Sequence, residues 1–101
     1  MSKLATIEKY EVIFSTKFKR QYKKIKRQNK DLDELFNVID ILSKKEKLPT
    51  KYKDHLLIND KYYKDCRECH ISPDWLLIYQ YQDERLVLLL IATGSHSDLF
   101  R

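Results

Sequence analysis

Three histidines, His55, His70 and His96, are the side chains in this sequence best suited to acid–base chemistry. Each lies in a polar motif beside an apolar run, and one motif continues from His70 through Pro73 and Asp74. An unperturbed imidazole has a pKa of about 6.5, so it can accept or donate a proton near neutral pH. In a basic chain, these motifs suggest acid–base chemistry on a phosphodiester. The alternative is that the three histidines are ordinary surface or strand residues.

Cleavage of a phosphodiester without a metal places three demands on such a site. A base must take the proton of the attacking hydroxyl, an acid must protonate the departing oxygen, and cations must stabilise the phosphate. Arg67 has the guanidinium that fits phosphate, but strict strand alternation places it on the opposite face from His70 unless a bulge intervenes. The histidines with Asp74 could instead hold a transition metal, and their wide spacing in the sequence neither supports nor excludes this.

The net charge of +5 comes from one basic block. Between residues 17 and 30 the chain has no acidic residue and eight basic ones: Lys17, Lys19, Arg20, Lys23, Lys24, Lys26, Arg27 and Lys30. Such a block is usually a solvated face, but on a helix it can also bind a polyanion.

Length and composition predict a single domain over residues 1–101. The longest apolar run, Leu86 to Ala92, is too short to span a membrane, and the N-terminus lacks the features of a signal peptide. We therefore expect a cytoplasmic protein without membrane contact. Cys66 and Cys69 form a lone Cys-x-x-Cys that would point to opposite faces of a strand, so we expect both to be structural.

The N-terminal half predicts a short strand and two helices. Tyr10 to Phe14 is strand-like, and Ser15 or Thr16 can cap a helix in which Phe18, Tyr22 and Ile25 recur at helical spacing. Asp31 is a plausible cap for the second helix. Its apolar stripe comprises Leu32, Leu35, Phe36, Ile39 and Leu42.

The C-terminal half predicts an antiparallel meander. The expected strands are His55 to Ile58, Lys64 to Ile71, Trp75 to Tyr81 and Arg85 to Thr93, the last apolar on both faces and therefore central. Ser95 to Phe100 would form a terminal turn or short helix. The predicted fold class is α+β, with two N-terminal helices packed on one face of a mostly antiparallel, twisted sheet of about four to five strands.

Nearly the whole chain resembles a known family. The motifs are Tyr-Lys-Asp-His ending at His55, Arg67 through His70 to Asp74-Trp75 with an apolar strand after it, and Gly-Ser-His-Ser-Asp-Leu-Phe ending at Phe100. Together they are similar to the YafQ-type branch of the RelE/ParE toxin superfamily. One departure is the loop of residues 59–63, which lacks the glycine often found there; Asn and Asp tolerate the same backbone next best.

The resemblance implies a RelE-like fold and a ribosome-dependent mRNA endonuclease that needs no metal or other cofactor. It implies His55, His70, Asp74 and His96 as the catalytic set, with His96 or His70 as the acid and the base among His55, His70 and Asp74. Trp75 and Phe100 could stack on an mRNA base, although either could equally be a packing residue. Arg67 could contact phosphate, and the basic block would dock on ribosomal RNA.

The resemblance also implies protein partners. A cognate antitoxin, with an acidic and largely disordered segment, would silence the toxin, and the complex would bind operator DNA through the antitoxin. Two other functions remain open at this point. One is the gyrase poisoning of the ParE-like branch, and the other is an inert antitoxin-binding or RNA-binding module.

Overall fold

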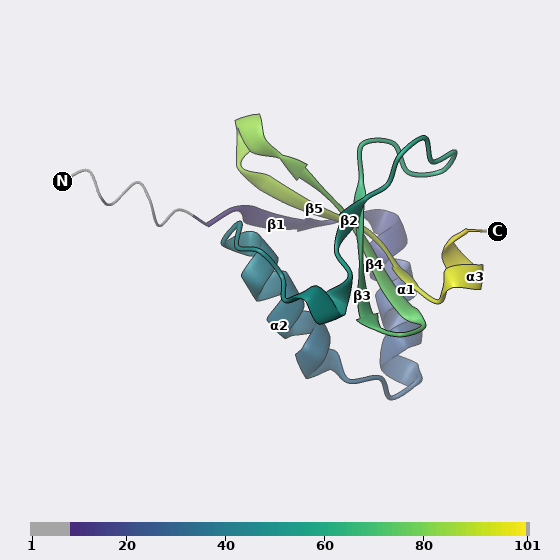
Figure 1. The fold of residues 1–101 in the computed structure, drawn as a ribbon. Helices are drawn as coiled ribbons and strands as arrows, with labels where there is room; N and C mark the ends of the chain where they lie inside the picture. The colour runs from purple at the N-terminus through teal and green to yellow at the C-terminus, as the bar shows by residue number, and fades with distance from the viewer. Residues whose placement is uncertain (1–8, 101) are drawn as a thin grey trace.

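A computed structural model describes residues 9–100, which form a five-stranded sheet covered on one face by two helices (Figure 1). The elements in chain order are β1 (Glu11–Phe14), α1 (Thr16–Arg27), α2 (Leu32–Ser43), the 3-10 helix η2 (Thr50–Tyr52), β2 (His55–Leu56), β3 (Arg67–Ser72), β4 (Trp75–Gln82), the 3-10 helix η3 (Asp83–Arg85), β5 (Val87–Gly94) and α3 (His96–Leu99). Within residues 9–100, no helix is both long enough and apolar enough to cross a membrane.

The strand order is β1-β5-β4-β3-β2. The four later strands pair antiparallel in sequence order, whereas β1 pairs parallel with β5. The α1–α2 hairpin carries the chain across one face, from β1 at one edge of the sheet to β2 at the other (Figure 1). The predicted α+β class is confirmed, and β5 lies inside the sheet as its apolar sequence indicated.

Side-chain caps begin both helices where the sequence predicted. The Ser15 hydroxyl accepts a hydrogen bond from the Phe18 amide at 2.9 Å, and the Asp31 carboxylate accepts one from the Glu34 amide at 3.2 Å. These bonds satisfy amides that have no partner within the first helical turn. They fix the start of α1 and of α2, and hence which face of each helix meets the sheet.

The predicted apolar stripe of α2 is wrong at one position. Phe36 is 49% exposed, and its ring lies 6.3 Å from that of Tyr22 on α1. Val38, which was not part of the predicted stripe, is fully buried instead. At 100° per residue, the buried stripe follows Leu35, Val38 and Leu42 and leaves Phe36 at the rim between the two helices.

Each face of the sheet has its own core. The face under the helices holds the larger core, which includes Cys69, Trp75, Leu77 and Tyr79. The opposite face holds a smaller core of Tyr63, Cys66, Leu76, Ile78, Ala92 and Leu99. Cys66 and Cys69 are therefore buried on opposite faces as free thiols, and burial raises the pKa of both.

The loop between β2 and β3 turns without glycine. Asn59 has a φ of 55°, the left-handed conformation that asparagine tolerates better than most residues. The Asp60 carboxylate then accepts hydrogen bonds from the amides of Tyr62 and Tyr63 at 2.8 and 2.9 Å. Local side-chain bonding thus replaces glycine and delivers Tyr63 to the smaller core.

Candidate functional site

Two of the three histidines flank a buried carboxylate. His55 on β2 is paired directly with Glu68 on β3, and His70 lies two residues further along β3, so all three side chains share one face. Oε1 of Glu68 lies 3.3 Å from Nε2 of His55 and 3.5 Å from Nε2 of His70. Glu68 is only 6% exposed, whereas both imidazoles reach the surface. The carboxylate can therefore orient both rings.

The second nitrogen distinguishes His55 from His70. Nδ1 of His55 lies 2.8 Å from the backbone carbonyl oxygen of Lys53, so acceptors face both of its ring nitrogens. Among residues 9–100, no hydrogen-bond partner faces Nδ1 of His70. Within this part of the chain, His70 is thus the one of the two whose second nitrogen can reach a substrate.

His96 reaches the same end of the sheet from β5. In the strand register His70 pairs with Leu76, which pairs with Gly94, so His70 and Gly94 lie two strand spacings, or about 10 Å, apart on one face. Gly94 has a φ of 158°, which side-chain-bearing residues rarely adopt, and allows the sharp exit into α3. His96 is the first residue of that helix.

Asp74 and Phe100 hold the His96 segment. Oδ1 of Asp74 accepts a hydrogen bond from the His96 amide at 3.2 Å, which ties the β3–β4 turn to α3. The ring of Phe100 stacks on the His96 imidazole, with 4.8 Å between centroids. Its other neighbour is Tyr63, whose ring lies 5.4 Å away in an edge contact. Phe100 therefore supports His96, and it remains half-buried at the surface.

The expectation that Arg67 could contact substrate phosphate is corrected. Arg67 lies on the helix-covered face, where it donates to Asp54 at 3.0 Å and to the Tyr79 hydroxyl at 3.3 Å. The bulge in β3 falls between His70 and Ser72, beyond Arg67, so it does not turn Arg67 toward the histidines. The ion pair with Asp54 also raises the pKa of the guanidinium and satisfies its charge. Arg67 is a structural residue that braces the segment before His55.

The expectation that Trp75 could stack on a base is corrected as well. Trp75 is 2% exposed in the larger core, and its indole N–H donates to the Thr93 hydroxyl at 2.9 Å. Both faces of the ring are covered, so no base can stack on it without disrupting the core. The packing interpretation of Trp75 is the one that its burial supports.

The basic block lies mainly on the exposed surface of α1. Lys17, Lys19, Arg20, Lys23, Lys24, Lys26 and Arg27 are exposed, whereas Lys30 is half-buried with its amine 5.9 Å from the centre of the Trp75 ring. Two of them support the site: Lys17 donates to the Tyr63 hydroxyl at 3.0 Å, and Lys24 pairs with Asp98 on α3 at 3.5 Å. Part of the cationic surface is thus committed to holding the C-terminal turn.

Sequence reasoning missed Glu68. Its signal was the two-residue spacing to His70 on a predicted strand, which puts both side chains on the same face. An acidic residue on a predicted strand does not by itself indicate a buried site, because such residues are mostly solvated. Only the cross-strand register, which the sequence does not specify, reveals that His55 lies opposite it.

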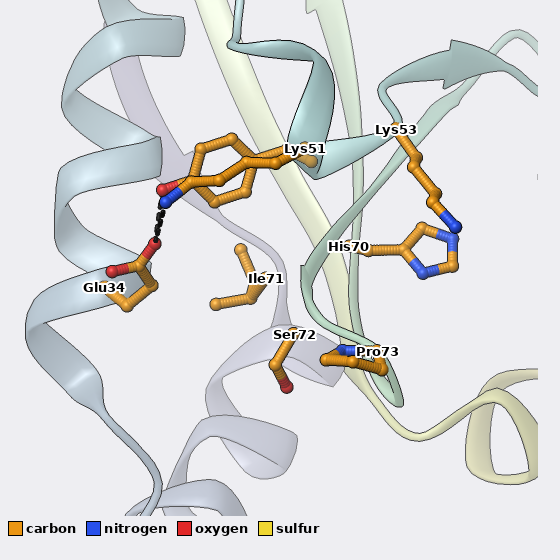
Figure 2. A pocket seen from close by; sticks show the side chains of 8 residues that line it. Glu34, Lys51, Lys53, His70, Ile71, Ser72 and Pro73 are labelled. Carbon is orange, nitrogen blue, oxygen red and sulfur yellow. Dashed lines mark hydrogen bonds and ion pairs between the residues drawn. The ribbon is translucent and has the colours of Figure 1, made fainter.

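A pocket of about 370 Å³ opens beside His70 (Figure 2). Its lining residues are Glu34, Lys51, Tyr52, Lys53, His70, Ile71, Ser72 and Pro73. The Tyr52 hydroxyl donates to the Glu34 carboxylate, which raises the pKa of Tyr52, and Lys51 lies 4.0 Å from the same carboxylate. Figure 2 shows the Lys53 side chain extending toward the His70 ring.

The site has no ready-made metal centre within residues 9–100. In that range no group of three or more His, Cys, Asp or Glu side chains is arranged to hold a metal ion. His55 and His70 both direct Nε2 at the same Glu68 oxygen, and Asp74 bonds to the His96 backbone instead of joining them.

Comparison with known proteins identifies relatives over almost the whole chain. Residues 10–101 match the family described as the bacterial toxin of type II toxin–antitoxin systems, YafQ. The "mRNA interferase toxin YafQ" of Escherichia coli strain B is 33% identical over 91 residues, which cover 89% of this chain and 95% of the relative.

Solved structures agree with the sequence comparison. A metal-bound toxin from Helicobacter pylori is 40% identical, with a TM-score of 0.84 over 90% of this chain and 99% of its own. YafQ in the Escherichia coli DinJ–YafQ complex is 32% identical, with a TM-score of 0.79 over 91% of this chain and 99% of its own.

Proposed function

The chain belongs to the YafQ family of type II toxin–antitoxin toxins, and we propose that it cleaves translated mRNA on the ribosome by acid–base catalysis without a metal. It is an endoribonuclease of the mRNA interferase class, the activity named for its YafQ relatives. One observation supports the proposed mechanism. His55 and His70 both contact Glu68, and the His96 segment, bonded to Asp74, begins at the same end of that sheet face.

His70 is the proposed base and His96 the proposed acid. Glu68 holds Nε2 of His70, which leaves Nδ1 to accept the proton of the 2′-hydroxyl. The 2′-oxygen then bonds to phosphorus, the bond from phosphorus to the 5′-oxygen breaks, and the protonated His96 gives its proton to that oxygen. The products are a 2′,3′-cyclic phosphate and a free 5′-hydroxyl, so atoms and protons balance without a co-reactant.

His55 and Asp74 complete the site as positioning residues. His55 is held between Lys53 and Glu68, so it fixes the carboxylate that orients His70. Asp74 holds the first amide of α3 and thereby the origin of the His96 side chain. Both roles keep the acid and the base in register, on which general acid–base catalysis depends.

The positive charge on the surface of α1 favours binding to the ribosome. The exposed lysines and arginines of α1 present positive charge beside the histidine face, which favours contact with ribosomal RNA phosphates. Lys17 and Lys24 touch the loop and α3 that build the site, so docking through α1 would place the site relative to the bound mRNA.

A cognate antitoxin is the proposed protein partner, since the Escherichia coli relative is solved in complex with DinJ. The α1–α2 surface offers a groove of about 480 Å³ whose apolar floor includes Phe14 and Phe36, both nearly half exposed. Lys19, Lys23 and Lys26 line the same groove. An amphipathic antitoxin segment with acidic residues fits this combination, and operator DNA would be bound through the antitoxin.

Primer extension on an mRNA translated in a purified system tests the proposal. Wild type should give discrete in-frame cuts only when ribosomes are present, and His70→Ala and His96→Ala should each abolish them. A DNA strand of the same sequence should stay intact, because it has no 2′-hydroxyl. Cuts that survive both substitutions would overturn the catalytic set. DNA damage without translation arrest would indicate that the chain poisons gyrase and does not cleave mRNA.

Chelation tests the absence of a metal from the mechanism. The relative from Helicobacter pylori was solved with metal bound, so this chain must be assayed directly. Toxin that has been stripped with EDTA and desalted before it meets magnesium-loaded ribosomes should cleave as fast as untreated toxin, because an imidazole base and acid supply both proton transfers. Loss of cleavage by the stripped toxin, with recovery on added zinc, would replace this mechanism with a zinc-dependent one.

A further inference from the structure

The pocket beside His70 exists because β2 is short. β2 pairs only with Arg67 and Glu68, so from Cys69 onward β3 has no strand on that side among the described residues. η2 packs beside this edge, and the pocket lies between η2, α2 and the β3–β4 turn (Figure 2). The free edge and His70 therefore open into the same space.

Two lysines line this pocket in different electrostatic states. Lys51 lies 4.0 Å from Glu34 and over the Tyr52 ring, so its charge is matched. Lys53 has no ion pair within residues 9–100, because Asp54 beside it is bound by Arg67 and Tyr79. Lys53 is thus the uncompensated cation of the pocket, and its side chain extends toward His70 (Figure 2).

The backbone at Lys53 is tied to the site. Its φ of 49° places it in the left-handed region and turns the chain from η2 into β2. Its carbonyl oxygen lies 2.8 Å from Nδ1 of His55, and its amide donates to the Thr50 carbonyl at 3.0 Å. The backbone from which the lysine side chain departs is therefore fixed relative to His55.

The pocket walls suit a nucleoside. Tyr52, Ile71 and Pro73 supply apolar surface, while Ser72 offers a hydroxyl. Tyr52 is immobilised by its bond to Glu34. A partly apolar hollow with a few polar groups, next to a cation and an imidazole, matches a sugar and base attached to a phosphate.

Resting on the proposed ribonuclease function, we propose that this pocket is the subsite for the nucleotide at the scissile phosphate and that Lys53 binds that phosphate. Phosphoryl transfer needs a positive donor for the charge that grows on the phosphate oxygens. Arg67 lies on the other face and is paired with Asp54. Lys53 is on the side of the site where His70 acts.

Cleavage kinetics with matched lysine variants test this subsite. The assay measures the rate on ribosome-bound mRNA, with the toxin varied to saturation, for Lys53→Met, Lys53→Arg and Lys61→Met. Lys53→Met should lower the saturating rate about 100-fold, the effect of removing one donor to a developing oxyanion. Lys53→Arg should recover most of the loss, and Lys61→Met should cut at the wild-type rate, because Lys61 is exposed on the β2–β3 loop outside the pocket.

Filling the pocket gives a second, independent measurement. Ser72→Phe should raise the toxin concentration needed for half-maximal cleavage more than it lowers the saturating rate. Circular dichroism melts on all variants identify any that lose the fold.

The outcomes separate the subsite from the function on which it rests. Wild type that makes no cuts would overturn the ribonuclease itself. Wild type that cuts, with Lys53→Met cutting at the same rate or Lys61→Met equally impaired, would overturn the subsite alone. Unchanged kinetics in Ser72→Phe would show that no nucleoside binds in the pocket.

Discussion

Glu68 and His55 form the direct cross-strand pair of β2 and β3, with 3.3 Å between Oε1 of the carboxylate and Nε2 of the imidazole. The carboxylate is buried and the imidazole is half exposed. A buried carboxylate is stabilised only by donors that reach it, and within residues 9–100 ring nitrogens of His55 and His70 lie within 3.5 Å of Glu68. Glu68 therefore acts together with the two histidines and not as a packing residue alone.

Replacing Glu68 by glutamine should slow cleavage about 10- to 100-fold, the usual effect of losing the partner that orients a functional histidine. Glutamine keeps the shape and one acceptor oxygen, so the fold should persist. The measurement is the saturating cleavage rate on ribosome-bound mRNA.

The matched control for Glu68 is Glu84→Gln, which removes one exposed carboxylate far along the sheet. It should leave the cleavage rate unchanged. A Glu68→Gln protein that cleaves at the wild-type rate would mean that the carboxylate serves packing alone.

Replacing Trp75 by phenylalanine should reduce stability without reducing the activity of folded molecules. The change deletes the hydrogen bond from the indole to Thr93 and leaves a small void, which together cost about 1–3 kcal/mol. For a domain of this size, each kcal/mol corresponds to about 4–8 °C in melting temperature. Thermal melts measure the effect on stability, and cleavage at 20 °C measures the effect on activity. A variant with the wild-type melting temperature but slow cleavage would indicate that Trp75 stacks on a base after all.

Replacing Phe100 by leucine should reduce cleavage about tenfold while preserving the fold. Leucine keeps apolar contact with Tyr63, but it cannot stack on His96 as the aromatic ring does. The same loss is expected if the ring also stacks on a base. Phe36→Leu makes the same change in an exposed ring on the helix-covered side, far from His96, and is the control. Equal rates for the two variants would count against a role for Phe100.

Acid should loosen α3 through Asp98. The hydrogen bond from the Ser95 side chain, helped by Lys24, lowers the pKa of the Asp98 carboxyl below its ordinary value. Because the folded pKa is depressed, this contribution to stability is present above the unfolded pKa and is lost as the pH falls through the folded pKa. The amide NMR shifts of Ser95 and His96 should follow that titration. An identical titration in Asp98→Asn would assign it to another group.

The elements of this fold were predictable because local physics specifies them. Ser15 and Asp31 cap helices, Asn59 takes a left-handed turn, and the alternation around Arg67 and His70 sends them to opposite faces, each as the sequence indicated. Phe36 was not predictable, because the same apolar period fits either rim of a helix that contacts both a sheet and another helix.

The site was only partly predictable, because it depends on pairing between distant strands. Motifs in the sequence identify the histidines, but only the register brings His55 to Glu68. Trp75 was ambiguous for a different reason: an aromatic residue at a strand end suits a core and a base equally well. The burial of the Trp75 ring and the hydrogen bond from its indole N–H to Thr93 assign it to the core.

The complex with the cognate antitoxin should weaken as salt rises. Lys19, Lys23 and Lys26 line the apolar groove between the helices, and an acidic segment bound there gains attraction that added salt screens. Affinity should fall at least about tenfold between 0.05 and 0.5 M sodium chloride. Lys19→Gln with Lys23→Gln should flatten that dependence, whereas Lys61→Gln, on the exposed β2–β3 loop, should not. Isothermal titration calorimetry at several salt concentrations measures both, and an affinity independent of salt would show that the groove binds its partner by apolar contact alone.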